Sequence, residues 1–339
     1  MKRLTLLLCL LAIFCMIATG LAFGQAGVFM GTAIRSLENP YHLVWSRGGQ
    51  AFADSAGGIH VIQTCEGSSE KQLNDIKALI AKAGKNAVFC IDPNEAPNAV
   101  PIAKALDAAG IYFVTWWNKP DNVKAWNNPH WVAHIAFDGI STGEFTANEL
   151  IKSMGGKGKL VAIQGMLANT TAQDRFKGLQ NALAKNPGVQ LVAQDTGQWD
   201  RNKAFDLMKS FLVANPDVGG VWCANDNMAL GALEAIRAAG LAGKVLVSGA
   251  DGITEMLNAI DAGEAAATVL NDSFLRAGSA CPWPWQPRPA RSTSPRPRRR
   301  SASSSWRPSI STGTTSRRSS PSMSPARRST TGATCTPTT

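Results

Sequence analysis

Polar and aromatic residues follow most of the apolar segments of this chain, at the positions where β-strands would end. Amide, carboxylate and guanidinium groups offer planar hydrogen bonding, whereas tyrosine and tryptophan offer flat apolar faces. This mixture suits a sugar, because a sugar carries hydroxyl groups around its rim and C–H groups on its faces. The residues concerned are Asn39, Tyr41, His42, Trp117, Asn118, Asp138, Asn169, Arg175, Trp199, Asn225, Asp226, Asp251 and Asn271.

The sequence contains only incomplete versions of the residue patterns that are typical of catalytic, metal-binding or phosphate-binding sites. His130 and His134 have the spacing of two metal ligands on a helix, but they flank a strand-like segment, in which such residues stand roughly 13 Å apart. The segment GGKGK (155–159) lacks the glycine frame and the hydroxyl residue of a P-loop, and it precedes a strand. No nucleophile with a base can be named. We therefore expect a protein that is not an enzyme, with no metal site and no cofactor.

Apolar segments alternate with segments of helical length from residue 28 onward, in two series. The first predicts strands at 28–34, 60–64, 87–91, 112–117 and 132–138, with helices near 40–57, 69–83 and 95–109. The second predicts strands at 159–165, 189–195, 218–225, 245–251 and 266–272, with helices near 140–154, 170–186, 201–214, 227–239 and 253–262. Continuous apolar strands indicate burial on both faces, as in parallel sheets covered by helices. The fold class is therefore α/β, with two doubly wound parallel-sheet lobes.

The carboxyl ends of the parallel strands should bring the strand-end residues together, since open α/β sheets bind ligands there. Asn39 before Pro40 is also typical of a helix N-cap followed by proline, and we expect it to cap and to bind. Asp226 is expected to cap its helix instead of binding a ligand. Trp116 and Trp117 should face opposite ways, one buried and one presented. We interpret four further tryptophans as core or hinge packing: Trp45, Trp126, Trp131 and Trp222.

The first 24 residues have the organisation of a secretory signal peptide. Lys2 and Arg3 precede an apolar run over residues 4–18, and small residues precede Gln25. The run is short for a transmembrane span of roughly 20 residues. We expect cleavage after Gly24 and a soluble protein in the periplasm.

Positive charge is concentrated in the last 61 residues. The formal net charge is +10, but residues 279–339 contain 11 arginines and no acidic residue, so residues 1–278 carry 23 − 24 = −1. No basic face for nucleic acid is implied. The body uses 16 lysines to 7 arginines, whereas the tail uses no lysine. We interpret 279–339 as an out-of-frame tail of serine, threonine, proline and arginine that begins near Gly278.

Several stretches resemble the type I periplasmic binding proteins of ABC sugar transporters, most closely the ribose-binding-protein branch. The most specific is CANDNMALGALEAI, within residues 215–240. The others are SLENPYHLVWSRGGQAFA (36–53), the run at 87–111, VAHIAFDGISTGE (132–144), TAQDRFKGLQ (171–180) and VSGADG (247–252). Together they cover about residues 27–277 in the order of the family.

This resemblance implies two lobes joined by a hinge, which close over one small ligand. It divides the chain into the signal peptide (1–24), a first lobe (25–137 with 272–278), a second lobe (138–271) and the tail (279–339), which replaces the C-terminal completion of the first lobe. It also implies a monomer that delivers its ligand to the permease and ATPase of an ABC transporter. By position, the family's ligand contacts fall on Asn39, Tyr41, His42, Arg175, Trp199, Asn225, Asp251 and Asn271.

One pair of positions departs from the family pattern. The family usually has an Asp-Arg pair after the fourth strand, where this chain has Trp117 and Asn118. The change removes charged contacts and adds a stacking surface, so the expected ligand is a monosaccharide or polyol that need not be a pentose. Asp138, at the crossing between the lobes, completes the predicted ligand contacts.

Three alternatives belong to other classes. The sensor core of LacI-like repressors shares this fold, but those proteins begin with a helix-turn-helix, whereas this chain begins with an export signal. A sugar sensor that feeds a chemoreceptor would use the same site. A sugar-modifying enzyme would have to change the bound sugar.

Overall fold

The computed structural model describes residues 28–84 and 87–280, which belong to one compact unit. The predicted signal peptide and all but the first two residues of the predicted tail lie outside the described residues. Within residues 28–84 and 87–280, no helix is long and apolar enough to cross a membrane.

The first lobe is built on a five-stranded parallel sheet of order β2-β1-β3-β4-β5. Its strands are β1 (Phe29–Ile34), β2 (Ile59–Thr64), β3 (Ala87–Ile91), β4 (Tyr112–Trp116) and β5 (Trp131–Ile135). The helices are α2 (Pro40–Ser55), α3 (Ser69–Ala83), α4 (Ala99–Ala108) and, after the chain returns from the second sheet, α10 (Ser273–Ala280). Short 3-10 turns occupy η1 (Ala96–Asn98) and η2 (Ala125–Asn127).

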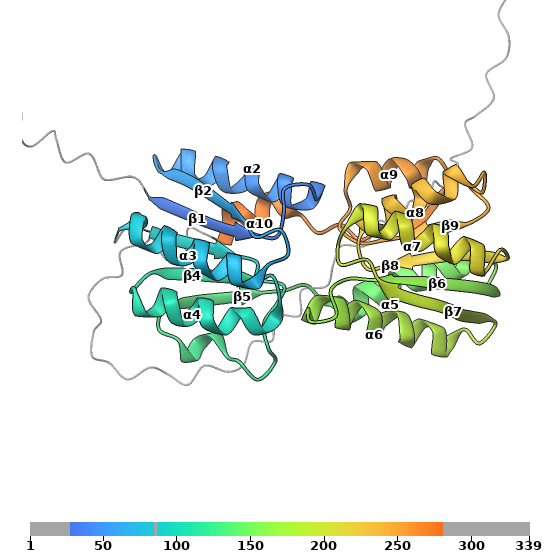
Figure 1. Cartoon of the computed structure of the whole chain (residues 1–339), viewed down its shortest axis with the longest axis horizontal. Coiled ribbons are helices and arrows are strands. Elements are labelled where there is room, and N and C mark those ends of the chain that lie inside the picture. The colour runs from blue at the N-terminus through green and yellow to red at the C-terminus, as the bar shows by residue number, and fades with distance from the viewer. Residues whose placement is uncertain (1–27, 85–86, 281–339) are drawn as a thin grey trace, which may run out of the picture. The chain divides into compact units, whose positions relative to one another are not determined.

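Both faces of the first sheet are covered, which explains its continuous apolar strands. Phe89 and Ile91 of β3 pack in one core with residues of α3 and α4, whereas Val88 and Cys90 pack in another with residues of α2 and α10. Helix α10 lies against α2 (Figure 1) so closely that a Cβ atom on Gly48 would stand 2.1 Å from the carbonyl oxygen of Phe274.

The second lobe repeats this plan with a five-stranded parallel sheet of order β10-β9-β8-β6-β7. Its strands are β6 (Gly158–Gln164), β7 (Val189–Thr196), β8 (Val218–Cys223), β9 (Leu246–Ser248) and β10 (Ala265–Ala267). Its helices are α5 (Gly139–Ser153), α6 (Thr170–Lys185), α7 (Arg201–Ala214), α8 (Asp226–Ala238) and α9 (Thr254–Asp261). The chain enters this lobe between β5 and α5 and leaves it between β10 and α10.

The predicted α/β fold with two parallel sheets is confirmed, and each predicted strand and helix has its counterpart. The largest differences are β9 and β10, which have three residues each where seven were predicted. Beyond these two strands, the segments stay connected by hydrogen bonds from Gly249 N to Ala267 O and from Asp251 N to Val269 O, and by an isolated bridge between Asp251 and Leu270. Apolar residues such as Val269 continue there because their side chains stay buried beyond the regular strands.

The predicted capping and tryptophan roles are partly corrected. Asn39 caps α2, with Pro40 as the first helical residue. The cap of α8 is Asn225, which accepts a hydrogen bond from Met228 N, so the prediction that Asp226 caps this helix is wrong. Trp45, Trp131 and Trp222 are buried as predicted, but Trp126 is 78% exposed.

Candidate functional site

A cavity lies where loops that follow strands of both sheets meet. Its lining combines amides, carboxylates and arginines with the rings of Tyr41, His42, Trp117 and Trp199. The residues that line it are Arg35, Asn39, Tyr41, His42, Asp92, Pro93, Asn94, Trp117, Asn118, Asn169, Thr171, Arg175, Trp199, Asn225 and Asp251.

Nine of the eleven predicted ligand contacts line this cavity: Asn39, Tyr41, His42, Trp117, Asn118, Arg175, Trp199, Asn225 and Asp251. Asp138 and Asn271 do not. Asp138 is exposed and caps α5, where its Oδ1 accepts a hydrogen bond from Ser141 N at 2.9 Å. Asn271 lies behind Asp251 and donates from Nδ2 to Asp251 Oδ1 over 3.3 Å. The structure therefore places Asp138 away from the cavity and gives Asn271 a supporting position.

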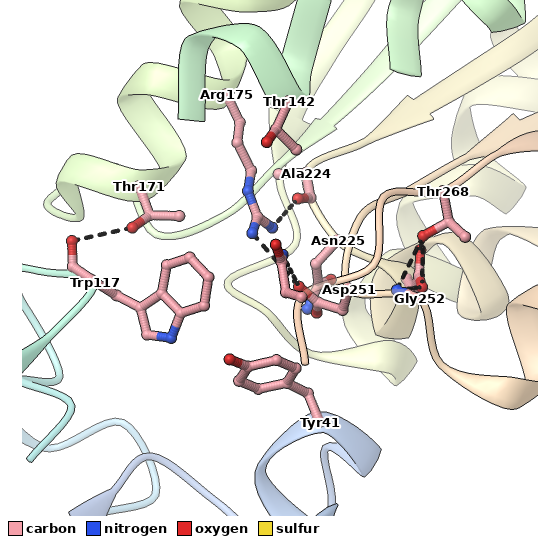
Figure 2. A network of polar contacts seen from close by, with 12 residues as sticks. Tyr41, Trp117, Thr142, Thr171, Arg175, Ala224, Asn225, Asp251, Gly252 and Thr268 are labelled. Carbon is pink, nitrogen blue, oxygen red and sulfur yellow. Dashed lines mark hydrogen bonds and ion pairs between the residues drawn. The ribbon is translucent and has the colours of Figure 1, made fainter. Parts of the chain in front are cut away.

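Arg175 stands at the centre of the second-lobe wall (Figure 2) and is 3% exposed. Its Nη1 donates to the carbonyl oxygen of Ala224 at 2.6 Å, and its Nη2 reaches Asp251 Oδ1 at 3.4 Å. Helix α6 can present Arg175 here because α5 approaches it through Gly143, where a Cβ atom would stand 1.9 Å from Arg175 O. A fixed guanidinium held by two acceptors is suited to fork-like hydrogen bonding.

Asp251 provides the carboxylate of the same wall, in a backbone conformation that L-residues rarely adopt. Its φ is +141°, and it is 7% exposed. Burial raises the pKa of Asp251, while the nearby Arg175 charge acts against this shift. Conformations of this kind persist only where the surroundings enforce them, and they cluster at functional sites.

The first-lobe wall has a polar network that the sequence interpretation missed. His42 Nε2 lies 3.3 Å from Asp92 Oδ2, and Asn118 Nδ2 donates to Asp92 Oδ1 over 3.2 Å. Asp92, Pro93 and Asn94 directly follow β3. The strand-end rule that selected the other residues would have found them if it had been applied to the third strand. Arg35 and Thr171 were also missed.

Asn169 connects the two lobes at the edge of the cavity. In the amide orientation that satisfies its neighbours, Nδ2 donates to Asn94 O at 3.0 Å, and Oδ1 accepts from Asn118 Nδ2 and Trp199 Nε1, each at 3.2 Å. Close by, Thr171 Oγ1 donates to Trp117 O at 3.1 Å. The side chain of Asn169 does not cap its own helix.

The sequence model of the family described as periplasmic binding protein domain matches residues 30–282. The chain belongs to this family. Its relatives include the D-allose-binding periplasmic protein of Escherichia coli (strain K12), 34% identical over 70% of this chain and 76% of the relative. The ribose import binding protein of Salmonella typhimurium (strain LT2) is 29% identical over 79% of this chain and 86% of its own length. A solved structure described as a twin-arginine translocation pathway signal protein from Burkholderia phytofirmans is 45% identical, covers 75% of this chain and 80% of its own, and has a TM-score of 0.74.

The predicted membership of a periplasmic binding protein family similar to ribose-binding proteins is thus confirmed. In this periplasmic binding protein, two polar side-chain atoms at the cavity have no hydrogen-bond partner among the described protein atoms. Arg175 Nε and Asn118 Oδ1 are buried and have no such partner. Buried polar groups are normally hydrogen-bonded, so these two groups fit a polar ligand.

Proposed function

We propose that this chain is the solute-binding component of an ABC sugar importer and that it binds a monosaccharide or polyol in the cavity between its lobes. The observation that supports the proposal most strongly is an arrangement of four side chains. Arg175, a forked hydrogen-bond donor, lies beside the acceptor Asp251, and the ring faces of Trp117 and Trp199 accompany this pair. Two relatives whose names specify allose and ribose support the sugar class.

The preferred ligand need not be a pentose. Trp117 and Asn118 occupy the positions of the family's Asp-Arg pair, so that wall offers an indole face and an amide. Asp92, one strand away, supplies a carboxylate beside Asn118. The first lobe therefore keeps a carboxylate acceptor, but at Asp92 instead of at the position of the family's aspartate. At the position of the family's arginine, Asn118 provides an amide and no guanidinium.

Binding is expected to proceed by closure of the lobes about the crossings near Asp138 and Asn271. Polar residues from both lobes line one cavity, and only closure removes them from water together. Small-angle scattering should show a smaller radius of gyration at ligand saturation. An unchanged radius would contradict hinge closure. The closed form would then present a surface from both lobes to the permease, whose ATPase supplies the energy of transport.

The proposed function requires that the protein is exported. We infer that the signal peptide is removed after Gly24 and that the protein acts as a monomer in the periplasm. Mass spectrometry of the periplasmic fraction should give a chain that begins at Gln25. An unprocessed chain in the cytoplasm would count against export.

The tail is interpreted as the product of a shifted reading frame. The family match ends at residue 282, close to the last acidic residue, Asp272. Translation of the DNA from about codon 278 in the other two frames should restore Lys, Glu and Asp in a pattern that begins with an amphipathic helix. Stop codons within a few codons in both frames would show that the tail is genuine.

Tryptophan fluorescence tests the site directly, because Trp117 and Trp199 both line the cavity. A monosaccharide that binds there should change the emission of the full chain, and the Trp117→Phe and Trp199→Phe variants should each reduce the change. Trp126→Phe is a matched control, because Trp126 is largely exposed and does not line the cavity. A signal that depends only on Trp126 would place the ligand elsewhere.

A further inference from the structure

Asp226 is a fully buried carboxyl group that no part of the proposed function uses. It is the first residue of α8 and is 0% exposed, between Asn225 at the cavity and the next helical residue. It does not line the cavity. Since Asn225 caps the helix, capping does not explain why a carboxyl group is buried here.

The Asp226 side chain is instead bound to the loop that carries Asp251. Its Oδ2 accepts hydrogen bonds from Gly252 N at 2.8 Å and Ile253 N at 3.1 Å. Thr268 Oγ1 lies 2.8 Å from both carboxyl oxygens and also accepts from Gly252 N at 3.1 Å. Figure 2 shows these contacts on the side of Asp251 that faces away from Trp117. The backbone adds one more bond, from Asp226 N to Ala250 O at 2.8 Å. The loop is thus held immediately before and immediately after Asp251.

The surrounding residues are shaped for this contact. Residue 249 must be small, because a Cβ atom on Gly249 would stand 2.4 Å from Asp226 Oδ1. Gly252 has φ +72°, in the left-handed region that glycine enters freely. Asp251 has no such freedom, so its positive φ has to be enforced by its neighbours.

Retaining a carboxyl group at this place is costly. Burial, and then the charge of Asp251, raises the pKa of Asp226 to about 7. Among the described residues, no cationic side chain donates a hydrogen bond to its oxygens. Asp226 Oδ2 accepts from both loop N–H groups, and Gly252 N also donates to Thr268 Oγ1 at 3.1 Å. Without the carboxylate, the partly buried Ile253 N would lose this acceptor and Gly252 N would keep the Thr268 hydroxyl alone.

We propose that Asp226 is a positioning residue for ligand binding, which holds the 250–253 loop so that the Asp251 carboxylate faces Arg175 and the cavity. The inference rests on the proposed function, because it takes Asp251 as a ligand contact. Asp226 itself does not contact the ligand.

A double-mutant cycle tests the coupling in the full chain, with D-allose and D-ribose as probes in calorimetry. Asp226→Ala should weaken binding by about tenfold or more in the wild-type background, because Ile253 N loses this acceptor and Gly252 N keeps only the Thr268 hydroxyl, so the loop is no longer held to α8 by the side chain. In the Asp251→Ala background the same change should weaken binding by less than about twofold, because the group that it positions is already absent. Equal fold-changes in the two backgrounds would overturn the proposal.

Two matched pairs separate positioning from loss of the fold. Asp226→Asn keeps the shape and one acceptor oxygen and should restore most of the affinity lost in Asp226→Ala. Thr268→Val should weaken binding, whereas Thr268→Ser, which keeps the hydroxyl, should not. If both Thr268 variants bind equally, or if the asparagine variant is as weak as the alanine variant, the proposed contact does not act.

Hydrogen exchange of the ligand-free protein gives a readout that does not need the ligand. Asp226→Ala should speed exchange at residues 250–254 and leave β6 unchanged. If this loop exchanges at the wild-type rate in the Asp226→Ala variant, the proposal is overturned, whatever the ligand is. If Asp251→Ala leaves sugar affinity unchanged although the loop responds as expected, the proposed sugar site fails and the loop contact stands.

Discussion

The guanidinium carbon of Arg175, in the second lobe, lies 5.5 Å from the ring centroid of Trp117, in the first. A cation over an indole face is a favourable contact, and it is stronger where water is excluded. The contact therefore joins the lobes at the cavity and places a ring face beside a hydrogen-bonding fork. These are the two kinds of group that a sugar requires.

Arg175 should contribute strongly to binding. Arg175→Lys keeps the charge but cannot reach both Ala224 O and Asp251 in the same geometry. We expect it to weaken sugar binding by about 2 kcal/mol or more, since truncating one partner of a buried charged contact costs about 2 to 5 kcal/mol. Arg237→Lys is the matched control, because Arg237 pairs with Glu264 at the surface of the same lobe. Equal affinities of the two variants would contradict this role.

Trp117 should set preference and not overall affinity. Aromatic contacts are worth about 0.5 to 1.5 kcal/mol beyond the area they bury, and a ring face tolerates changes in the position of hydroxyl groups. The pair Trp117→Asp with Asn118→Arg restores the family pattern and should move the preference towards pentoses. The measurement is the ratio of the dissociation constants for ribose and a hexose. A ratio equal to that of the wild type would show that these positions do not select the sugar.

Asn169 should slow release of the ligand, since it hydrogen-bonds to Asn94 and Asn118 in one lobe and to Trp199 in the other. Asn169→Ala should raise the dissociation rate about five- to tenfold, as expected for one or two lost hydrogen bonds of about 1 kcal/mol each. Asn227→Ala is the control, because Asn227 Nδ2 donates to the backbone carbonyl oxygen of Trp199, but within the second lobe. Stopped-flow fluorescence would give both rates. Similar rates in the two variants would mean that Asn169 only supports Trp199.

The first lobe should lose stability in mild acid because of two partly buried histidines, His60 and His134. Burial lowers the pKa of His134 from 6.5 to about 4, with Lys119 acting in the same direction, and burial shifts the pKa of His60 similarly. Between about pH 4 and 6.5 the unfolded chain therefore binds more protons than the folded protein, so the free energy of unfolding falls as the pH drops. The raised pKa of Asp226 has the opposite sign, with stability falling as the pH rises from about 4 to 7.

A variant isolates the histidine contribution. His134→Gln keeps an amide near Thr115 Oγ1, the present partner of His134 at 2.9 Å, but it cannot be protonated. The free energy of unfolding of the wild type minus that of the variant, measured by urea denaturation, should decrease from pH 7 to pH 4.5. The contribution of Asp226 cancels in this difference. A constant difference would contradict the lowered pKa.

The sequence was sufficient to predict the two sheets, because their strands are buried on both faces and therefore lack polar alternation. Val88 and Phe89, adjacent in β3, enter different cores, which is why both are apolar. It was not sufficient for the ends of β9 and β10, which stop at Ser248 and Ala267 although apolar side chains such as Val269 remain buried beyond them. Burial selects apolar residues in either case, so composition alone cannot mark the end of a ladder.

Most of the site could be predicted because strand ends converge in a parallel fold. The exceptions depend on which group a side chain binds first. Asp138 follows β5, as the strand-end rule requires, but its carboxylate accepts hydrogen bonds from Ser141 in the first turn of α5. Asn169 has the sequence of a helix cap, yet its amide binds across the lobes. Competition between local and distant hydrogen-bond partners is decided by tertiary geometry, which the order of residues does not reveal.

Calorimetric titration of the purified full chain is the most direct test of sugar binding, with a companion form in which the frame from codon 278 is restored. The panel would contain pentoses, hexoses, deoxy sugars and polyols, with amino acids and short peptides as the opposing class. The account predicts micromolar or tighter binding of at least one monosaccharide or polyol, weakened by Arg175→Lys. Tight binding of an amino acid or peptide, with no response to any sugar or polyol, would contradict it.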